Sequence, residues 1–203
     1  NSFLMTAIIN IPKIRIDYVI EKGRMESGMQ TVFNILFMPA SVLTLIYIVF
    51  RPLLTKMAIE WNAGRKKGFL KIVGMIFICL LGISIIVLGG SAWLGIPILS
   101  ILYGLDLSKY RMELLIMITG GCLCTFSYVF DNALIVIRRQ YLLLFSYVLS
   151  WIYIEIVIGK MVDKWGVLGA AFAYSTSMMV FLIITFLIFI ICLRKDGKEL
   201  KEQ

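Results

Sequence analysis

Residues Trp165–Leu193 read WGVLGAAFAYSTSMMVFLIITFLIFIICL, a run of apolar and small residues without a single charge. A helix needs roughly 20 such residues to cross a hydrocarbon core of about 30 Å. A charge at the centre of a bilayer costs at least ~2.5–3.5 kcal/mol on insertion scales, so uncharged runs mark membrane spans. This stretch therefore predicts a transmembrane helix.

The composition of the whole chain agrees with this interpretation. Of the 203 residues, 61% are hydrophobic and 16% are charged, whereas a soluble domain averages roughly 45–50% apolar and about a quarter charged residues. Water-soluble classes are excluded, and so is a strand-built barrel, because no segment alternates apolar and polar residues. The chain has no histidine, which excludes histidine-dependent zinc enzymes, catalytic triads and phosphohistidine chemistry.

Other uncharged runs predict further spans, and the fold class is an all-α polytopic bundle of about six transmembrane helices. The opening run stops at Asn10-Ile11-Pro12-Lys13 and covers only about half of a bilayer. It has no charged segment typical of a signal peptide, so we expect residues 1–203 to be the C-terminal piece of a longer protein whose first helix is truncated here. Gly89-Gly90 and Gly95-Ile96-Pro97 divide the third run into a span and a short external helix or turn. The runs are Ser2–Ile9, Ser27–Phe50, Ile72–Leu105, Leu114–Phe130 extended to Ile137, Gln140–Ile154 extended to Gly159, and Trp165–Leu193.

An amphipathic helix is predicted between the second and third runs, from Arg51 to Trp61. Its polar positions are Thr55, Lys56, Glu60 and Asn62. Such a helix is expected to lie in the headgroup plane, with its proline in the first turn and its tryptophan at the interface. The apolar positions on its other face are Leu53, Leu54, Met57, Ala58 and Trp61.

The positive charges predict the orientation. Twelve Lys and Arg residues fall in the loop Arg51–Lys71, the turn Arg138-Arg139 and the tail after Leu193; eight fall in the opposite set of loops, where acids dilute them. Cytoplasmic loops carry the excess of basic residues, so the C-terminus is expected in the cytoplasm. The net charge of +8 is then attraction to anionic lipid at about 1 kcal/mol per basic residue, and no nucleic-acid partner is expected.

Two carboxylates, Asp131 and Glu155, lie nearest to membrane depth, where acids are functional candidates. Asp131, with Ser127 and Asn132 nearby, is a candidate polar lining or ion site facing a cavity. The alternative is local pairing or snorkelling toward Arg138 and Lys160 respectively. The four cysteines, which lack metal-ligand spacing, are interpreted as packing residues. No metal and no cofactor is expected. Small residues at 120, 121, 124, 166, 169, 170, 173 and 177 predict close helix contacts within the bundle, and Pro39 predicts a kink.

Several stretches resemble one family, the polysaccharide or oligosaccharide exporters, which are lipid-linked-oligosaccharide flippases of the superfamily that also contains the multidrug and toxin extrusion transporters. The similar segments occur in the order of the family's landmarks and cover nearly the whole chain. They are Asn10-Ile11-Pro12-Lys13-Ile14-Arg15-Ile16-Asp17, Phe37-Met38-Pro39-Ala40, Phe50-Arg51-Pro52-Leu53-Leu54-Thr55 with Trp61-Asn62, Gly95–Gly104, and Trp165–Ala171.

The resemblance implies the second half of a twelve-helix bundle around a central cavity, a cytoplasmic C-terminus in the inner (plasma) membrane, and transport without covalent chemistry. The expected partners are a polyprenyl-pyrophosphate-linked oligosaccharide, membrane lipids and the N-terminal half of the transporter. The expected function is flipping of this precursor during capsule, exopolysaccharide or cell-wall polysaccharide assembly. Such a cargo requires a hydrated, basic cavity; the candidate substrate-binding residues are Lys13, Arg15 and Arg51, with Asp131 as a polar lining, and interfacial anchoring is the alternative for Arg51.

Two other functions stay open. An ion-coupled exporter of organic cations requires acids deep in the cavity, and only Asp131 and Glu155 qualify. A membrane-embedded glycan polymerase, ligase or glycosyltransferase usually carries its charged catalytic residues in a sizeable loop. The longest loop expected here is about twenty residues, Arg51–Lys71, so the chain is predicted not to be an enzyme.

Overall fold

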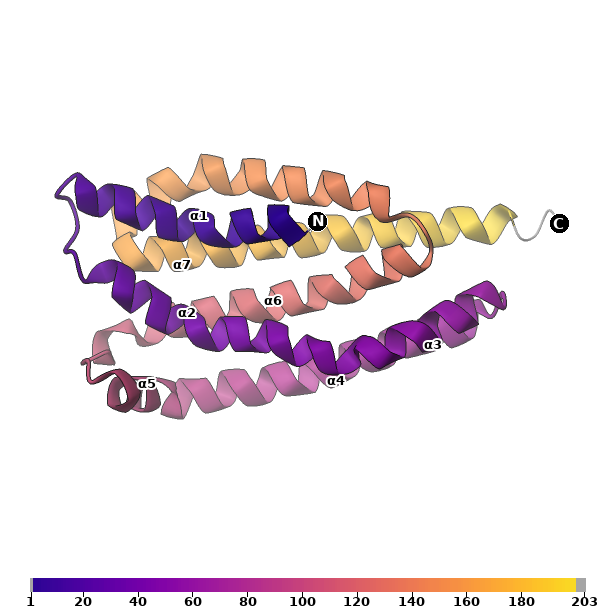
Figure 1. Ribbon diagram of the computed structural model, residues 1–203, viewed down its shortest axis with the longest axis horizontal. Helices are drawn as coiled ribbons and strands as arrows, with labels where there is room; N and C mark the ends of the chain where they lie inside the picture. Colours follow the sequence, from indigo (N-terminus) through magenta and orange to yellow (C-terminus); the bar gives the residue numbers. More distant parts are fainter. Residues whose placement is uncertain (1, 200–203) are drawn as a thin grey trace.

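The computed structural model describes residues 2–199, and among these residues it consists of helices joined by short connections, with no strand (Figure 1). Four segments are long and apolar enough to cross a membrane: Met29–Asn62, Lys66–Tyr103, Ser108–Val136 and Gln140–Lys195. The predicted all-helical fold class is therefore confirmed, and these four segments are consistent with a membrane protein.

The elements are α1 (Ser2–Glu21), α2 (Met29–Ile46), the 3₁₀ turn η1 (Tyr47–Phe50), α3 (Arg51–Asn62), α4 (Lys66–Gly90), the π-helical turn η2 (Ser91–Gly95), α5 (Ile96–Tyr103), the 3₁₀ turn η3 (Ser108–Tyr110), α6 (Arg111–Val136), the 3₁₀ turn η4 (Gln140–Leu142) and α7 (Leu143–Glu199).

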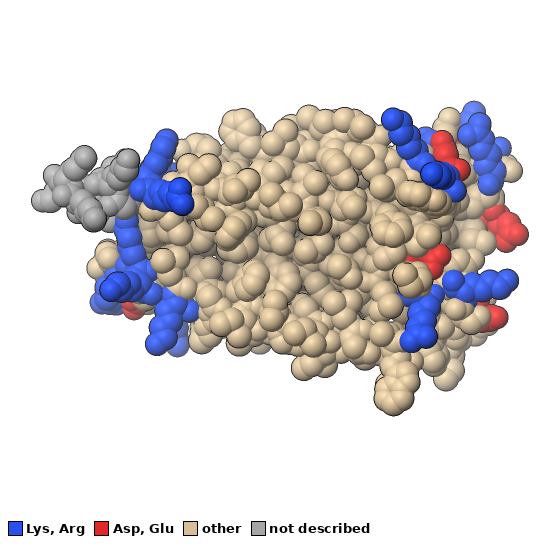
Figure 2. All heavy atoms as spheres, turned by 180° about the vertical axis from the view of Figure 1, so that it is seen from behind, with Lys and Arg blue, Asp and Glu red and all other residues tan. Residues whose placement is uncertain are grey.

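On the face shown in Figure 2, charged side chains gather at the two ends of the bundle and leave an uncharged belt between them. One end carries the α3–α4 and α6–α7 connections, and the other carries the α1–α2 connection and α5 (Figure 1). A belt of this kind suits the hydrocarbon core of a bilayer. Two basic tail residues in the charge count, Lys201 and the side chain of Lys198, lie outside the described part of the chain.

Helix α7 reverses direction at Gly166, so that its two arms lie side by side (Figure 1). Gly166 has φ 58° and ψ −130°, a backbone conformation that costs residues with a Cβ atom of order 1–3 kcal/mol. Three residues later, a Cβ atom on Gly169 would collide with the backbone carbonyl of Met161 on the other arm. The reversal falls at the start of the uncharged run Trp165–Leu193, after the preceding run Gln140–Ile154 and its extension through Glu155 to Gly159.

Helix α6 lies at the centre of the bundle, packed against α2, α4 and both arms of α7. Two glycines allow the close approach: a Cβ atom on Gly121 would lie 2.9 Å from Cα of Ala40 in α2, and one on Gly120 would lie 2.5 Å from the Tyr174 ring in α7. Ala40 directly follows Pro39, the one proline within α2. The predicted role of small residues as packing contacts within the bundle is confirmed at these positions.

The first helix does not end where the opening uncharged run ends, near Pro12. Helix α1 continues through Pro12 to Glu21, and the loop is Lys22–Gly28. The charges after Pro12 do not end the helix because Ile16 and Val19 between them are buried against the bundle. Asn10 also supports the helix, since its side-chain nitrogen donates to the Thr6 carbonyl at 2.8 Å.

Helix α3 has the predicted two faces but a different neighbour. Met57 is buried and Lys56 is exposed, as the pattern predicts. However, α3 continues the line of α2 (Figure 1) and packs its apolar face against α4, where the Trp61 and Phe69 rings lie 5.1 Å apart. The twenty-residue loop expected at Arg51–Lys71 is thus a helical hairpin, and the longest connection within residues 2–199 is Lys22–Gly28.

Candidate functional site

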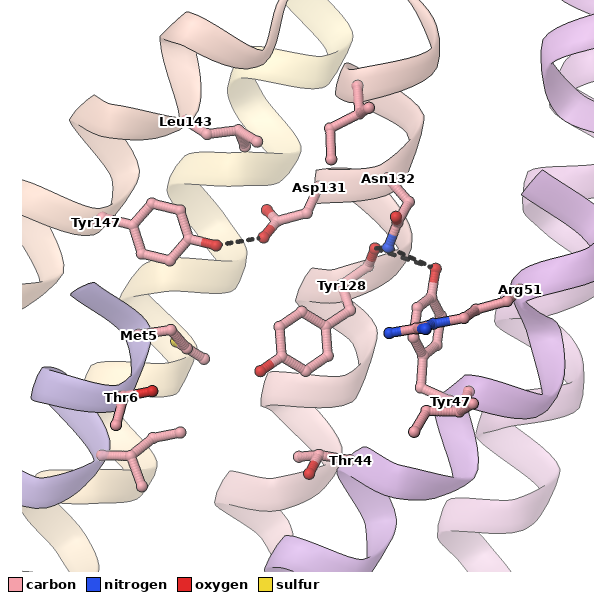
Figure 3. Close-up of a pocket in the computed structure, with 13 residues that line it drawn as sticks. Met5, Thr6, Thr44, Tyr47, Arg51, Tyr128, Asp131, Asn132, Leu143 and Tyr147 are labelled. Carbon is pink, nitrogen blue, oxygen red and sulfur yellow. Dashed lines mark hydrogen bonds between the residues drawn. The ribbon is translucent and has the colours of Figure 1, made fainter. Parts of the chain in front are cut away.

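A pocket of about 400 Å³ lies between the start of α1, the α2–α3 junction, α6 and the first arm of α7. We refer to it as the central pocket (Figure 3). It combines hydroxyl, amide and charged side chains with aliphatic ones. Its lining residues are Met5, Thr6, Ile9, Thr44, Tyr47, Ile48, Arg51, Tyr128, Asp131, Asn132, Ile135, Leu143 and Tyr147.

The α6 residues that line this pocket lie on one face of the helix. Tyr128, Asp131, Asn132 and Ile135 are spaced i, i+3, i+4 and i+7, so they share one face of α6. Ser127, which we expected beside Asp131, is fully buried elsewhere and donates to the Leu123 carbonyl at 2.9 Å. Asn132 does line the pocket.

Asp131 is 5% exposed, and its carboxylate has one partner in the described structure. The Tyr147 hydroxyl donates to Oδ2 at 2.8 Å (Figure 3), while Oδ1 has no hydrogen-bond partner. The interaction with Arg138 that sequence spacing suggested does not form. The ion pairs among the described residues join Arg15 to Asp163 and Arg65 to Glu60. Burying a carboxylate with an unsatisfied oxygen is costly. A ligand that donates a hydrogen bond to this oxygen would reduce that cost.

A second network links α6 to the α2–α3 junction. The Asn132 side-chain nitrogen donates to the Tyr47 hydroxyl at 3.0 Å and to the Tyr128 carbonyl at 2.7 Å. The Tyr47 hydroxyl donates to the same carbonyl at 3.2 Å. These bonds hold the tyrosine side of the pocket in place (Figure 3).

Arg51 is exposed at the rim of the central pocket. Its guanidinium points back toward the Tyr47 side chain in Figure 3, although Arg51 begins α3. Within the described residues it belongs to neither ion pair. Of the four predicted substrate-binding residues, the structure brings Arg51 and Asp131 together in one cavity.

Lys13 and Arg15 lie elsewhere. The Lys13 ammonium is 4.9 Å from the centre of the Phe37 ring, a cation–π contact between α1 and α2. The Arg15 guanidinium forms an ion pair with Asp163 at 3.0 Å, joining α1 to the first arm of α7. Arg15 and Glu155 also line a separate cavity of about 280 Å³ at that contact.

The remaining polar candidates from the sequence are the four cysteines. Within residues 2–199, Cys79 is exposed, whereas Cys122, Cys124 and Cys192 are buried. No group of three or more Cys, Asp or Glu residues in this part of the chain is arranged to hold a metal ion.

The sequence reasoning missed the tyrosines of the central pocket, Tyr47, Tyr128 and Tyr147. Two signals were available. Tyr47 precedes Arg51 by four residues and Tyr128 precedes Asp131 by three, so each shares a helix face with a charged candidate. Tyr147 carried no local signal, because its partner Asp131 lies on a different helix.

No protein family, curated protein or solved structure matches this chain.

Proposed function

We propose that this chain is part of a membrane transporter that flips a lipid-linked oligosaccharide, with the central pocket holding polar groups of the cargo. The observation that carries the proposal is the lining of that pocket. Tyr47, Tyr128 and Tyr147 stand beside Asp131, Asn132 and Arg51, and sugars offer hydroxyls that both donate and accept hydrogen bonds. Aromatic faces with a few polar groups are typical of small-molecule sites, and 400 Å³ falls within their usual range of about 300–1,000 Å³.

Under this proposal the chain crosses the membrane six times, through α1, α2, α4, α6 and the two arms of α7. Helix α3 and the start of α4 then form a basic hairpin at the cytoplasmic surface of the inner (plasma) membrane. The family resemblance of the landmark segments supports this arrangement, in which residues 1–203 form the second half of a larger bundle and face an N-terminal half.

The test compares Arg51→Gln with the matched control Lys56→Gln, because both residues are exposed and basic on α3. The purified full-length protein, with both halves, would be titrated in nanodiscs with a polyprenyl-pyrophosphate-linked oligosaccharide. Loss of a charge-assisted contact to phosphate should weaken binding by about tenfold for Arg51→Gln and leave Lys56→Gln within twofold. Surface polymer yield in cells that express the full protein with each variant should follow the same order.

Equal binding by the two variants would remove Arg51 from the site, and a chain that does not bind the lipid-linked glycan would overturn the proposal. An exporter of organic cations is the second candidate, favoured by the unpartnered oxygen of Asp131 and the surrounding tyrosine rings. Binding of tetraphenylphosphonium that requires Asp131, without binding of the glycan, would support that candidate instead.

A further inference from the structure

The central pocket presents two opposite charges that do not pair with each other. Asp131 and Arg51 both line it, yet neither takes part in an ion pair among the described residues. In Figure 3 the carboxylate of Asp131 lies on the α7 side of Tyr128, and the Arg51 guanidinium lies on the Tyr47 side. The two charges therefore mark separate parts of the pocket wall.

One oxygen of the Asp131 carboxylate can accept a hydrogen bond from a ligand. Tyr147 occupies Oδ2, and Oδ1 is buried without a partner. Torsions of the χ2 type in aspartate are broad, so a small rotation presents the second oxygen to the pocket that the side chain lines. A neutral sugar hydroxyl would fill the hydrogen bond but leave a buried negative charge, whereas an ammonium group would also neutralise it.

Arg51 favours an anionic group on the ligand. An exposed guanidinium at a pocket rim suits a phosphate or carboxylate, which it binds through two parallel N–H donors. Tyr128 and Tyr47 line the same pocket, with Tyr47 next to Arg51 in Figure 3, and both offer aromatic surface to a sugar ring. A ligand that satisfies the whole pocket is therefore dipolar, with a cationic donor at one end and an anion at the other.

We propose that the central pocket selects a sugar phosphate that carries a free amine, with the ammonium group at Asp131 and the phosphate at Arg51. This inference rests on the proposed function and narrows it to glycans that contain an unacetylated amino sugar near the phosphate linkage. Acidic sugars are disfavoured at the same position, because a second carboxylate would face Asp131.

The test uses a ligand series on the unmodified chain in nanodiscs, followed by calorimetry. Glucosamine 1-phosphate should bind at least tenfold more tightly than glucose 1-phosphate or N-acetylglucosamine 1-phosphate, which lack the cationic amine. Glucosamine without phosphate should also bind at least tenfold more weakly than its phosphate. This series needs no mutation, so it tests the proposal even if a pocket variant does not fold.

Variants then show which residue binds the amine of the ligand and which binds its phosphate. Asp131→Asn should reduce the preference for the amine to under twofold while glucose 1-phosphate binding stays within threefold. Arg51→Gln should weaken both sugar phosphates about equally and keep the preference for the amine. Glu155→Gln is the matched control, an acidic residue of α7 that lies outside the central pocket, and it should change neither quantity.

An unmodified chain that binds the three sugar phosphates equally, or binds none of them, overturns the inference, as does an Asp131→Asn variant that keeps the preference. The outcome is separable from that of the proposed function. A chain that binds the lipid-linked oligosaccharide without preferring the amine retains the proposed function and loses the inference. A protein that prefers the amine but does not flip glycans retains the amine-binding site and loses the proposed function.

Discussion

At the scale of single residues, the close approach of α6 to α2 depends on Gly121. The Ala40 backbone fills the space in which a side chain on Gly121 would sit, with its Cα and carbonyl oxygen both 2.9 Å from the Cβ position. Backbone atoms cannot rotate away as a flexible side chain can. The α6 face that carries Asp131 therefore depends on a glycine ten residues earlier for its position.

Gly121→Ala should destabilise the bundle by about 1–3 kcal/mol, the usual cost of overpacking a core. The matched control is Gly82→Ala on α4, where a Cβ atom meets nothing within 4 Å. Alanine there should be neutral or stabilise by up to about 1 kcal/mol through helix propensity. Unfolding in mixed micelles measures both. A Gly121→Ala variant as stable as the control would contradict the packing described here.

Asp106 is a titratable residue in the connection between α5 and η3, outside the four candidate spans. Hydrogen bonds from Ser108, including its backbone N–H at 3.0 Å, lower the pKa of the Asp106 carboxyl below its ordinary value of 3.8. A lowered pKa in the folded state means that the contact stabilises the turn above pH 3.8 and is lost as the pH falls through the lowered value.

Amide exchange at Ser108, corrected for its intrinsic rate, should therefore accelerate as the pH falls from above 3.8 through the lowered pKa of Asp106. Asp106→Asn keeps an acceptor for the same N–H but cannot titrate. Its corrected exchange should be independent of pH over this range. If the variant and the unmodified chain showed the same pH dependence, the Asp106 carboxylate would not be its cause.

At the scale of elements, the reversal of α7 at Gly166 brings its two arms together. The Tyr147 and Phe181 rings, one from each arm, lie 4.8 Å apart. The same reversal places Asp163 near α1, where it binds Arg15. A single glycine with positive φ thus determines the neighbours of the longest apolar run in the chain.

Gly166→Ala should cost about 1–3 kcal/mol because alanine rarely adopts this backbone conformation. Its Cβ atom would meet only Met25 Cε, at 3.5 Å, an ordinary contact, so the expected loss is one of backbone strain. Gly159→Ala is the control in the same helix: its Cβ atom would lie 3.6 Å from the Arg15 guanidinium, and the substitution favours the helix. Thermal unfolding in detergent should rank Gly166→Ala below the unmodified chain and Gly159→Ala at or above it.

At the scale of the whole molecule, the two charged ends in Figure 2 determine how the bundle can lie in a bilayer. Gly64 and Arg139 belong to connections at one end, and Lys22 and Asp106 belong to connections at the other (Figure 1). The excess of basic residues at the first end favours the cytoplasm there.

Reporter fusions should therefore be cytoplasmic after Gly64, Arg139 and Lys198, and external after Lys22, Asp106 and Asp163. Alkaline phosphatase and green fluorescent protein fusions at each site give complementary signals. A fusion after Gly64 that reports an external location would reverse the orientation. Fusions after Arg139 and Asp163 on the same side would show that the arms of α7 do not both cross the membrane.

The sequence by itself determined the helical membrane fold and the places of its apolar segments. The uncharged run Ser27–Phe50 overlaps α2 with η1 closely, and the uncharged run Leu114–Phe130 with its extension to Ile137 overlaps α6. These properties depend on free energies that add along the chain, chiefly the cost of burying charge, so a single sequence contains them. The opening uncharged run ends before α1 does, because Lys13 and Arg15 are charged although Ile16 and Val19 after them are buried against the bundle.

Only the tertiary structure decided which polar groups meet. Asp131 and Arg51 were candidates from sequence, but their common pocket, the Tyr147 hydrogen bond to Asp131 and the engagement of Arg15 by Asp163 depend on how each helix is rotated about its axis. Those rotations follow from close contacts such as Gly121 against Ala40 and from the reversal at Gly166. Hydrophobic burial is non-directional and does not specify them, whereas backbone contact and hydrogen-bond geometry do, and both require residues from distant parts of the chain.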